Sequence, residues 1–333
     1  MHSQTKVIYA TLKFLLPAIA LIACEDEVIS ERKISNTEIF VATVMAGQEK
    51  TRTTNTDLQT LALNHGTVAG IYTYLSGYTE ITDGYGYENK NYSYANGVWK
   101  HSSINFPVDE DKSLDIYVYA PRIDSEHTLN NIPVTVALDQ STETNYLASD
   151  FVFGSEKNVT NPRTNSSKEV NVTLYHAMSK IVLNIQDKDG VTSTLGHLSK
   201  VEIGSERFPV MTDAYVNITR TINSNDALQT TSAVLTGGTP GIITLMDVSS
   251  VDLGFSMAGI LPPQTLGSGG NNMTVYFTND GQVSTFEGVL TGTFRPGYVN
   301  TYTVVIDQSE LTILNASIIP WGTTESVSKV ISN

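Results

Sequence analysis

The side chains that could do chemistry are few and lie far apart along the chain. Cys24 is the only cysteine among 333 residues, so no internal disulfide can form. No nucleophile elbow, phosphate-binding loop or zinc spacing is present. The six histidines never recur at i, i+2 or i, i+4, the spacings of metal-binding pairs; they are His2, His65, His101, His127, His176 and His197. We therefore predict no catalytic residue, no metal and no cofactor.

Two groups come nearest to a chemical site. His176 stands on a predicted strand without a His, Cys or carboxylate ligand set near it in the sequence, so we interpret it as a core or interface histidine. Asp139 and Asp150 flank Tyr146 in a predicted loop that could bind calcium through oxygen atoms. Their spacing is not that of an EF-hand, and the sequence gives this calcium site little support.

The N-terminus has the pattern of an export signal. An apolar run, Phe14 to Ala23, follows Lys6 and Lys13 and is too short to span a bilayer. The tetrapeptide Leu21-Ile22-Ala23-Cys24 resembles a bacterial lipoprotein box, in which a peptidase cuts before the cysteine and its thiol carries the lipid. We predict a signal peptide at residues 1–23 and lipidation at Cys24. The alternative is an ordinary signal peptide with an unmodified cysteine.

The residues after Cys24 refine the predicted cellular location. Glu25-Asp26-Glu27 places an acidic cluster in the linker 24–36, and it resembles the signal that sends Bacteroidetes lipoproteins to the outer face of the outer membrane. A merely solvated leader is the alternative. The net charge of -14 argues against nucleic acid and against docking on anionic lipid, because both need a basic surface. We expect a surface-exposed lipoprotein of the cell outer membrane.

The rest of the sequence has the pattern typical of β-strands. Short segments rich in β-branched and aromatic residues alternate with clusters of Gly, Asn, Asp and Pro. The Asn96-Gly97 pair is a signal for a tight hairpin. The predicted strands include Ile71–Leu75, Leu114–Tyr119, Lys180–Ile185, Met273–Phe277 and Tyr302–Ile306. This pattern predicts an all-β fold built of antiparallel β-sandwiches.

A polar stretch near the middle of the chain suggests a domain boundary. About 300 residues follow the leader, which is enough for two units of roughly 150 residues. Residues 158–168 are rich in Asn, Thr and Ser and contain Pro162, and an alternating pattern restarts at Glu169. We predict an N-terminal sandwich at 37–168 and a C-terminal sandwich at 169–333.

Several landmarks follow one another along the chain. Besides the lipoprotein box, they are Glu38–Met45 with Lys50-Thr51-Arg52, Tyr175–Ile181, Leu261–Gln264, Arg295–Gly297 before Tyr302–Ile306, and Pro320-Trp321. Taken in this order, they resemble the fimbrillins, the lipoprotein-derived subunits of type V pili. The resemblance implies two transthyretin-like antiparallel β-sandwich domains after a lipoprotein signal peptide. It also implies other pilin subunits as partners, in a homo- or hetero-polymer that forms a fimbria and serves adhesion.

The resemblance assigns an assembly role to the first strand. In the family an arginine-specific protease cuts just after this strand, which maps onto the bond between Arg52 and Thr53. The cut would release the lipid and open an apolar groove together. We expect the face that fills this groove to consist of Phe40, Ala42, Val44 and Ala46, which recur at period two. The alternative is that the strand stays in its domain and that Arg52 is an exposed residue of a polar turn.

The last apolar segment, residues 311–321, is the expected donor for a neighbour's groove, by strand addition. We expect Leu314, Ala316 and Ile318 on one face and Ile319 and Trp321 as large anchors on the other; Leu311 and Ile313 complete the strand. The alternative is that this segment pairs within its own domain. A polar tail, residues 322–333, follows it, and could mark an anchor, accessory or tip subunit.

An aromatic stretch supports a second hypothesis, a glycan-binding surface lipoprotein that keeps its lipid. Coplanar exposed rings would stack on the sugars of a host glycan, whereas cross-strand packing would bury them. The exposure of the rings separates the two. The residues are Tyr72, Tyr74, Tyr78, Tyr85, Tyr87, Tyr92, Tyr94 and Trp99.

Overall fold

The computed structural model describes residues 34–45, 68–95, 98–101, 103–163, 167–188, 195–220, 233–251, 256–307, 310–314 and 317–321. These residues form mostly β-strands, together with the short helix α1 (Glu143–Ala148), whose N-cap Thr142 accepts a hydrogen bond from Asn145 N. The predicted β-rich fold is confirmed. No helix in the described part of the chain is long and apolar enough to cross a membrane.

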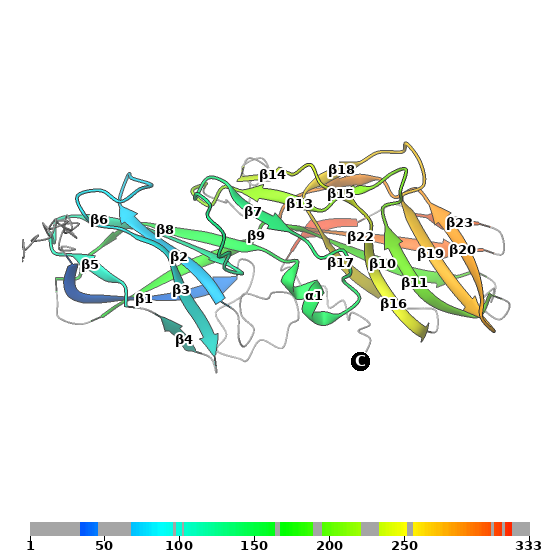
Figure 1. The fold of residues 1–333 in the computed structure, drawn as a ribbon, viewed down its shortest axis with the longest axis horizontal. Helices are drawn as coiled ribbons and strands as arrows, with labels where there is room; N and C mark the ends of the chain where they lie inside the picture. The colour runs from blue at the N-terminus through cyan, green and yellow to red at the C-terminus, as the bar shows by residue number, and fades with distance from the viewer. Residues whose placement is uncertain are drawn as a thin grey trace, which may run out of the picture. The chain divides into compact units, whose positions relative to one another are not determined.

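The first sheet has eight strands (Figure 1). In spatial order they are β4 (Val98–His101), β3 (Tyr87–Ala95), β2 (Val68–Leu75), β6 (Ser113–Ala120), β8 (Val152–Thr160), β9 (Lys168–His176), β1 (Ile34–Met45) and β5 (Asn105–Pro107). β1 is thus an interior strand of this sheet, hydrogen-bonded to β9 on one side and to β5 on the other.

Later strands form two larger sheets (Figure 1). One is ordered β17 (Ser256–Leu261), β10 (Ser179–Asp187), β22 (Tyr298–Ile306) and β23 (Leu311–Ile313), and β24 (Ser317–Pro320) also pairs with β22. The other is ordered β16 (Ile243–Val251), β11 (His197–Ile203), β19 (Met273–Asn279) and β20 (Gln282–Gly288).

Three small sheets complete the fold. They are β12 (Val210–Met211) with β15 (Pro240–Gly241), β18 (Gln264–Leu266) with β21 (Gly292–Phe294), and β14 (Val234–Thr236) with β13 (Asp213–Val216) and β7 (Ile132–Thr135). Because β7 precedes β8 in the sequence yet pairs with β13, the first half of the chain contributes a strand to a later sheet.

The buried apolar side chains form two clusters. The first joins residues of β1, β2, β3, β5, β6, β8 and β9, among them Ile39, Ile71 and Val172. The second, larger cluster is built mainly from residues after 176, such as Val182 and Phe277, and also includes Tyr72 and Tyr119 from the other face of the first sheet. The period-two alternation of the strands places opposite faces of β2 and β6 in different cores.

The strand pairings correct the predicted boundary near residue 168. β9, which was expected to open the second domain, pairs with β8 and β1 in the first sheet. Its inward residues Val170, Val172 and Leu174 belong to the first cluster. The polar stretch before β9 is therefore a connection within the first sheet. After β9, the next strand is β10, which begins at Ser179 and pairs with β17 and β22.

The expectation of purely antiparallel sandwiches was wrong at two pairs. β1 runs parallel to β9, and β10 runs parallel to β22. Both pairs join strands that are far apart in the sequence, and no local pattern reveals such a partner.

The local predictions fare better. The five segments predicted as strands all lie within strands. β3 and β4 form the predicted hairpin with Ala95 opposite Val98, although the turn Asn96-Gly97 lies outside the described residues. β19 and β20 are joined by Asp280 and Gly281, both at positive φ, as a type I′ turn requires.

Candidate functional site

The C-terminal segment (residues 311–321) lies along β22 of its own chain. Ile313 is opposite Val304 in β23, and Ile319 is opposite Val299 in β24. A turn in which Asp307 N donates to Glu310 O reverses the chain between β22 and β23. Among the described residues, β22 is the only strand to which this segment is hydrogen-bonded. The alternative that the last strand pairs at home thus describes its position in this structure.

The segment shows opposite faces to the core and to solvent. Leu311, Ile313 and Ile319 are partly buried against the second cluster. Leu314 and Ile318 are 48% and 49% exposed. Ala316, expected on the same face as these two, lies outside the described residues. Two of the three side chains expected to fill a groove are therefore free of the core in this position.

Trp321 ends the segment and is buried within its own chain, as the alternative of home pairing predicts. Its ring is 5% exposed and stacks face to face on His176, with ring centroids 3.8 Å apart and planes 2° apart. The backbone N–H of Trp321 donates to Gly297 O at 2.8 Å. Lys180 Nζ lies 5.7 Å from the centre of the Trp321 ring. The stack and the main-chain bond fix the end of the C-terminal segment from two directions.

His176 is held in place by Asp150. Its Nδ1 lies 3.1 and 3.0 Å from the two carboxylate oxygens of Asp150, and because a carboxylate only accepts, Nδ1–H is the donor. Both side chains are buried, at 5% and 1% exposure. We name Asp150, His176, Lys180, Gly297 and Trp321 the tryptophan dock.

Gly297 is required at the tryptophan dock by its backbone. Its φ of +70° lies in the left-handed region, where a side chain is strained. A Cβ at this position would also lie 3.3 Å from His176 O. Its N–H donates to Met178 O, so that the strands β10 and β22 are tied together directly beside the ring stack.

Four of the predicted family landmarks meet around the tryptophan dock. Tyr175–Ile181 supplies His176 and Lys180, Arg295–Gly297 supplies the carbonyl for Trp321, and Pro320-Trp321 supplies the ring. Leu261, which opens the fourth landmark, is opposite Ser179 in the β10–β17 pair. The landmarks thus form one structural junction.

Sequence reasoning missed Asp150 as the partner of His176. It expected no carboxylate near this histidine, but Asp150 follows α1 and reaches it from 26 positions earlier. The proposed calcium loop was also wrong, because Asp150 faces His176 and an oxygen of Asp139 accepts from Ser141 N. No cluster of metal-binding side chains occurs among the described residues. His176 itself is structural, as predicted.

In the first strand, β1, the side chains that face the core are those of Ile39 and Val41. Ile39 and Val41 are buried at 0% and 4% exposure, while Phe40 is 40% exposed and Ala42 is half-buried. The predicted inward face is therefore corrected at Phe40 and Ala42, the two of its four residues whose side chains are described. Both sets are apolar, and a shift of one residue reverses the face of a strand.

β1 is held on both edges. Residues 39–45 pair with β9, and Glu38 is opposite Asn105 of β5. Ile39 N donates to Ile104 O at 2.7 Å, and Tyr92 Oη donates to Ile39 O at 3.3 Å. The side chain of Val44 lies outside the described residues, as do Cys24, Ala46, Arg52 and Thr53.

The aromatic stretch packs inward. Five of its rings are at most 5% exposed: Tyr72, Tyr74, Tyr85, Tyr87 and Tyr92. Tyr78 is exposed, and the side chains of Tyr94 and Trp99 lie outside the described ones. The rings cross-pack, for example Tyr85 edge-on to Tyr87 with centroids 5.7 Å apart. The described rings thus follow the packing alternative and offer no sugar-stacking surface.

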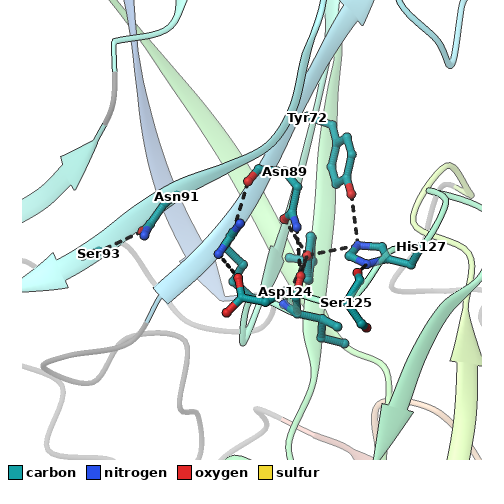
Figure 2. Close-up of polar contacts among 10 residues, drawn as sticks. Tyr72, Asn89, Asn91, Ser93, Asp124, Ser125 and His127 are labelled. Atoms are coloured by element: carbon teal, nitrogen blue, oxygen red, sulfur yellow. Dashed lines mark hydrogen bonds and ion pairs between the residues drawn. The ribbon is translucent and has the colours of Figure 1, made fainter.

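Hydrogen bonds from Tyr72 and Asn89 hold the loop of residues 123–127 against the first sheet (Figure 2). Tyr72 Oη donates to His127 Nε2 at 3.0 Å, and His127 Nδ1 donates to Ser125 O. Burial, followed by the negative charge of Glu88, raises the pKa of Tyr72 to about 12, so its hydroxyl stays protonated. Asn89 Nδ2 donates to Ile123 O on the same loop. These contacts are internally satisfied and indicate a structural role.

Comparison with known proteins gives the family. The fimbrillin-like family model matches residues 51–321, from the expected cleavage region to Trp321. No curated protein matches the chain in sequence. A candidate cell adhesion protein of Bacteroides ovatus has a similar structure, with 18% identity, coverage of 88% of this chain and 100% of that one, and a TM-score of 0.59. One of Bacteroides uniformis has 22% identity, coverage of 78% and 93%, and a TM-score of 0.54.

At these identities the two structures show a shared fold. The family match covers well over half of the chain, and its far end is the tryptophan dock. The chain therefore belongs to the fimbrillin-like family, whose members are structural and not enzymes.

Proposed function

We propose that the chain is a structural subunit of a cell-surface fimbria, joined to other pilin subunits by exchange of its C-terminal segment, with a role in adhesion. The family match supports a fimbrial subunit. The description of the two similar structures as candidate adhesion proteins supports the adhesive role.

The observation that carries this proposal is the outward face of the C-terminal segment. Leu314 and Ile318 expose about half of their surface on a strand that is paired to β22 alone. An exposed apolar edge strand is an aggregation hazard that proteins normally blunt. Burial of this face in a neighbour's groove would use it, with main-chain hydrogen bonds along the strand.

The acceptor in this proposal is the site that β1 fills. Removal of β1 would free the edges of β9 and β5 and uncover the core around Ile39 and Val41. A cut between Arg52 and Thr53 would separate β1 and Cys24, with its lipid, from the rest of the subunit. Before that cut, the lipid would hold the exported chain on the outer membrane.

We further propose two transthyretin-like sandwich domains with a corrected division. The first would extend from β1 to β9, which ends at His176, and the second from β10 onward, which begins at Ser179. The two apolar clusters support this division. The β7–β13 pair would then be a contribution of the first part of the chain to the second domain.

The test is mass spectrometry of the N-terminus of the protein sheared from cells, paired with the size of its assemblies. We expect a start at Thr53 and a ladder of stable oligomers. Arg52→Lys, which keeps the charge but removes the arginine-specific site, should retain Cys24 with its lipid and give no ladder. Oligomers in which the subunits still start at Cys24 would overturn the proposed maturation, and the chain would then act uncut as an anchor.

A further inference from the structure

We infer that the tryptophan dock is an autoinhibitory latch: the stack of Trp321 on His176 keeps the C-terminal segment on β22 and so restrains its donation. This inference rests on the proposed function for its consequence. The latch itself is a property of the single subunit and can be measured there.

The strand part of the segment is weakly held. Its pairing to β22 is divided into β23 and β24, and the residues opposite the division are Tyr302 and Thr303. At this division Leu314 N donates to Thr303 O. The outer edge of the segment has no hydrogen-bonded strand beside it in the described part of the chain. Short edge pairings of this kind open locally more readily than interior ones.

Trp321 is the strongest single anchor of the segment. It is the only described side chain of residues 311–321 that is fully buried. A coplanar aromatic contact adds to the burial of the ring itself. His176 cannot turn away without losing both oxygens of Asp150, so the surface that receives Trp321 is preformed. Asp150 is thus a positioning residue for the stack.

The home position also leaves polar groups unsatisfied. Trp321 Nε1, Asn300 Oδ1 and Thr301 Oγ1 are buried without a hydrogen-bond partner, and they account for most of such atoms among the described side chains. Asn300 and Thr301 lie opposite Ile318 and Ser317, directly under β24. A buried polar group without a partner is costly, and it regains hydrogen bonds when exposed to water. The C-terminal segment therefore combines a tightly held end at Trp321 with an unfavourable middle at β24, as a releasable latch requires.

The experiment is hydrogen exchange of the uncut chain, followed by peptide mapping. Trp321→Ala should raise the exchange rate of residues 311–321 about tenfold or more, since it removes the stack. The matched control, Ile318→Ala, truncates an exposed residue of the same strand and should leave that rate within about twofold. Equal rates in the two variants would overturn the latch.

A second variant covers the case in which Trp321→Ala unfolds the chain, which would appear as lost protection of β1 and β9. Trp321→Leu keeps an apolar side chain but no ring to stack, and should still raise exchange in residues 311–321 above the Ile318→Ala level. If it does not, the stack is not the latch.

Assembly is scored separately, after arginine-specific cleavage. Faster ladder formation by Asp150→Asn, which alters the tryptophan dock but not the donated segment, than by the unaltered chain is the expected result. Faster exchange without any ladder from either protein would retain the latch and refute strand donation. An unchanged exchange rate with a normal ladder would refute the latch and retain strand donation.

Discussion

β1 and the C-terminal segment are the two apolar strands to which assembly roles were assigned, and the structure holds them in different ways. β1 pairs with β9 and β5, and it buries Ile39 and Val41 completely or nearly so. The C-terminal segment pairs with β22 alone, leaves Leu314 and Ile318 exposed, and is buried fully only at Trp321.

This difference suggests different ways of leaving the fold. An interior strand with buried β-branched residues is bound along its length, because each such side chain contributes about 1.5–3 kcal/mol. An edge strand with one buried end can peel away from the rest. We therefore expect that β1 must be cut from the chain before it departs, whereas the C-terminal segment needs only its latch opened.

The largest expected effect is on the inward face of β1. Ile39→Ala should lower the free energy of unfolding by about 2–5 kcal/mol, because it leaves a cavity in the first cluster. The matched variant Phe40→Ala, at a 40% exposed position, should cost less than about 1 kcal/mol. Urea unfolding of both measures the difference. A larger loss for Phe40→Ala would restore the face expected from the sequence.

The next effect concerns the positioning of the stack. Asp150→Asn removes the charged acceptor of His176 Nδ1 and should lower the free energy of unfolding by about 1.5–3 kcal/mol. Asp124→Asn, at an 82% exposed carboxylate paired with Arg122, should change it by less than about 1 kcal/mol. Thermal unfolding at one pH compares them, and similar losses would mean that the dock adds nothing beyond a surface pair.

A smaller effect separates the two faces of β24. Ile319→Ala should cost about 1–2 kcal/mol, because Ile319 is partly buried against the second cluster. Ile318→Ala should cost less than about 0.5 kcal/mol at its exposed position. Denaturant midpoints at a constant m-value test this order. The reverse order would show that the segment presents its other face to the core.

The smallest effect on stability is expected for a double variant that should impair assembly the most. The double variant Leu314→Ser, Ile318→Ser should leave the free energy of unfolding of the subunit within about 1 kcal/mol, since both positions are exposed. It should nevertheless abolish the oligomer ladder, because these side chains would fill the neighbour's groove. A ladder equal to that of the unaltered chain would exclude this face from the contact between subunits.

The sequence predicted elements that local pattern determines. Alternation located the five predicted strands, and the Asn96-Gly97 signal located the hairpin of β3 and β4. It did not predict the inward face of β1, because Ile39 and Val41 and their neighbours Phe40 and Ala42 are all apolar. Period two gives two faces but does not say which meets the core when both are apolar.

Long-range partners were beyond the sequence for a related reason. The carboxylate that holds His176 is 26 positions away, and the β1–β9 and β10–β22 pairs join distant strands in parallel. The landmarks Tyr175–Ile181 and Pro320-Trp321 were recognised separately. Nothing in either shows that His176 and Trp321 stack, because that contact depends on the return of the chain along β22.

Native-state hydrogen exchange at two amides of the uncut chain tests the central difference most directly. Ile39 N–H donates to Ile104 O at 2.7 Å within the first sheet, and Leu314 N–H donates to Thr303 O at 2.9 Å at the edge of β22. We predict that Leu314 exchanges through a local opening that low urea does not affect, while Ile39 exchanges only through global unfolding. Equal free energies of opening at the two amides, with the same dependence on urea, would contradict the account.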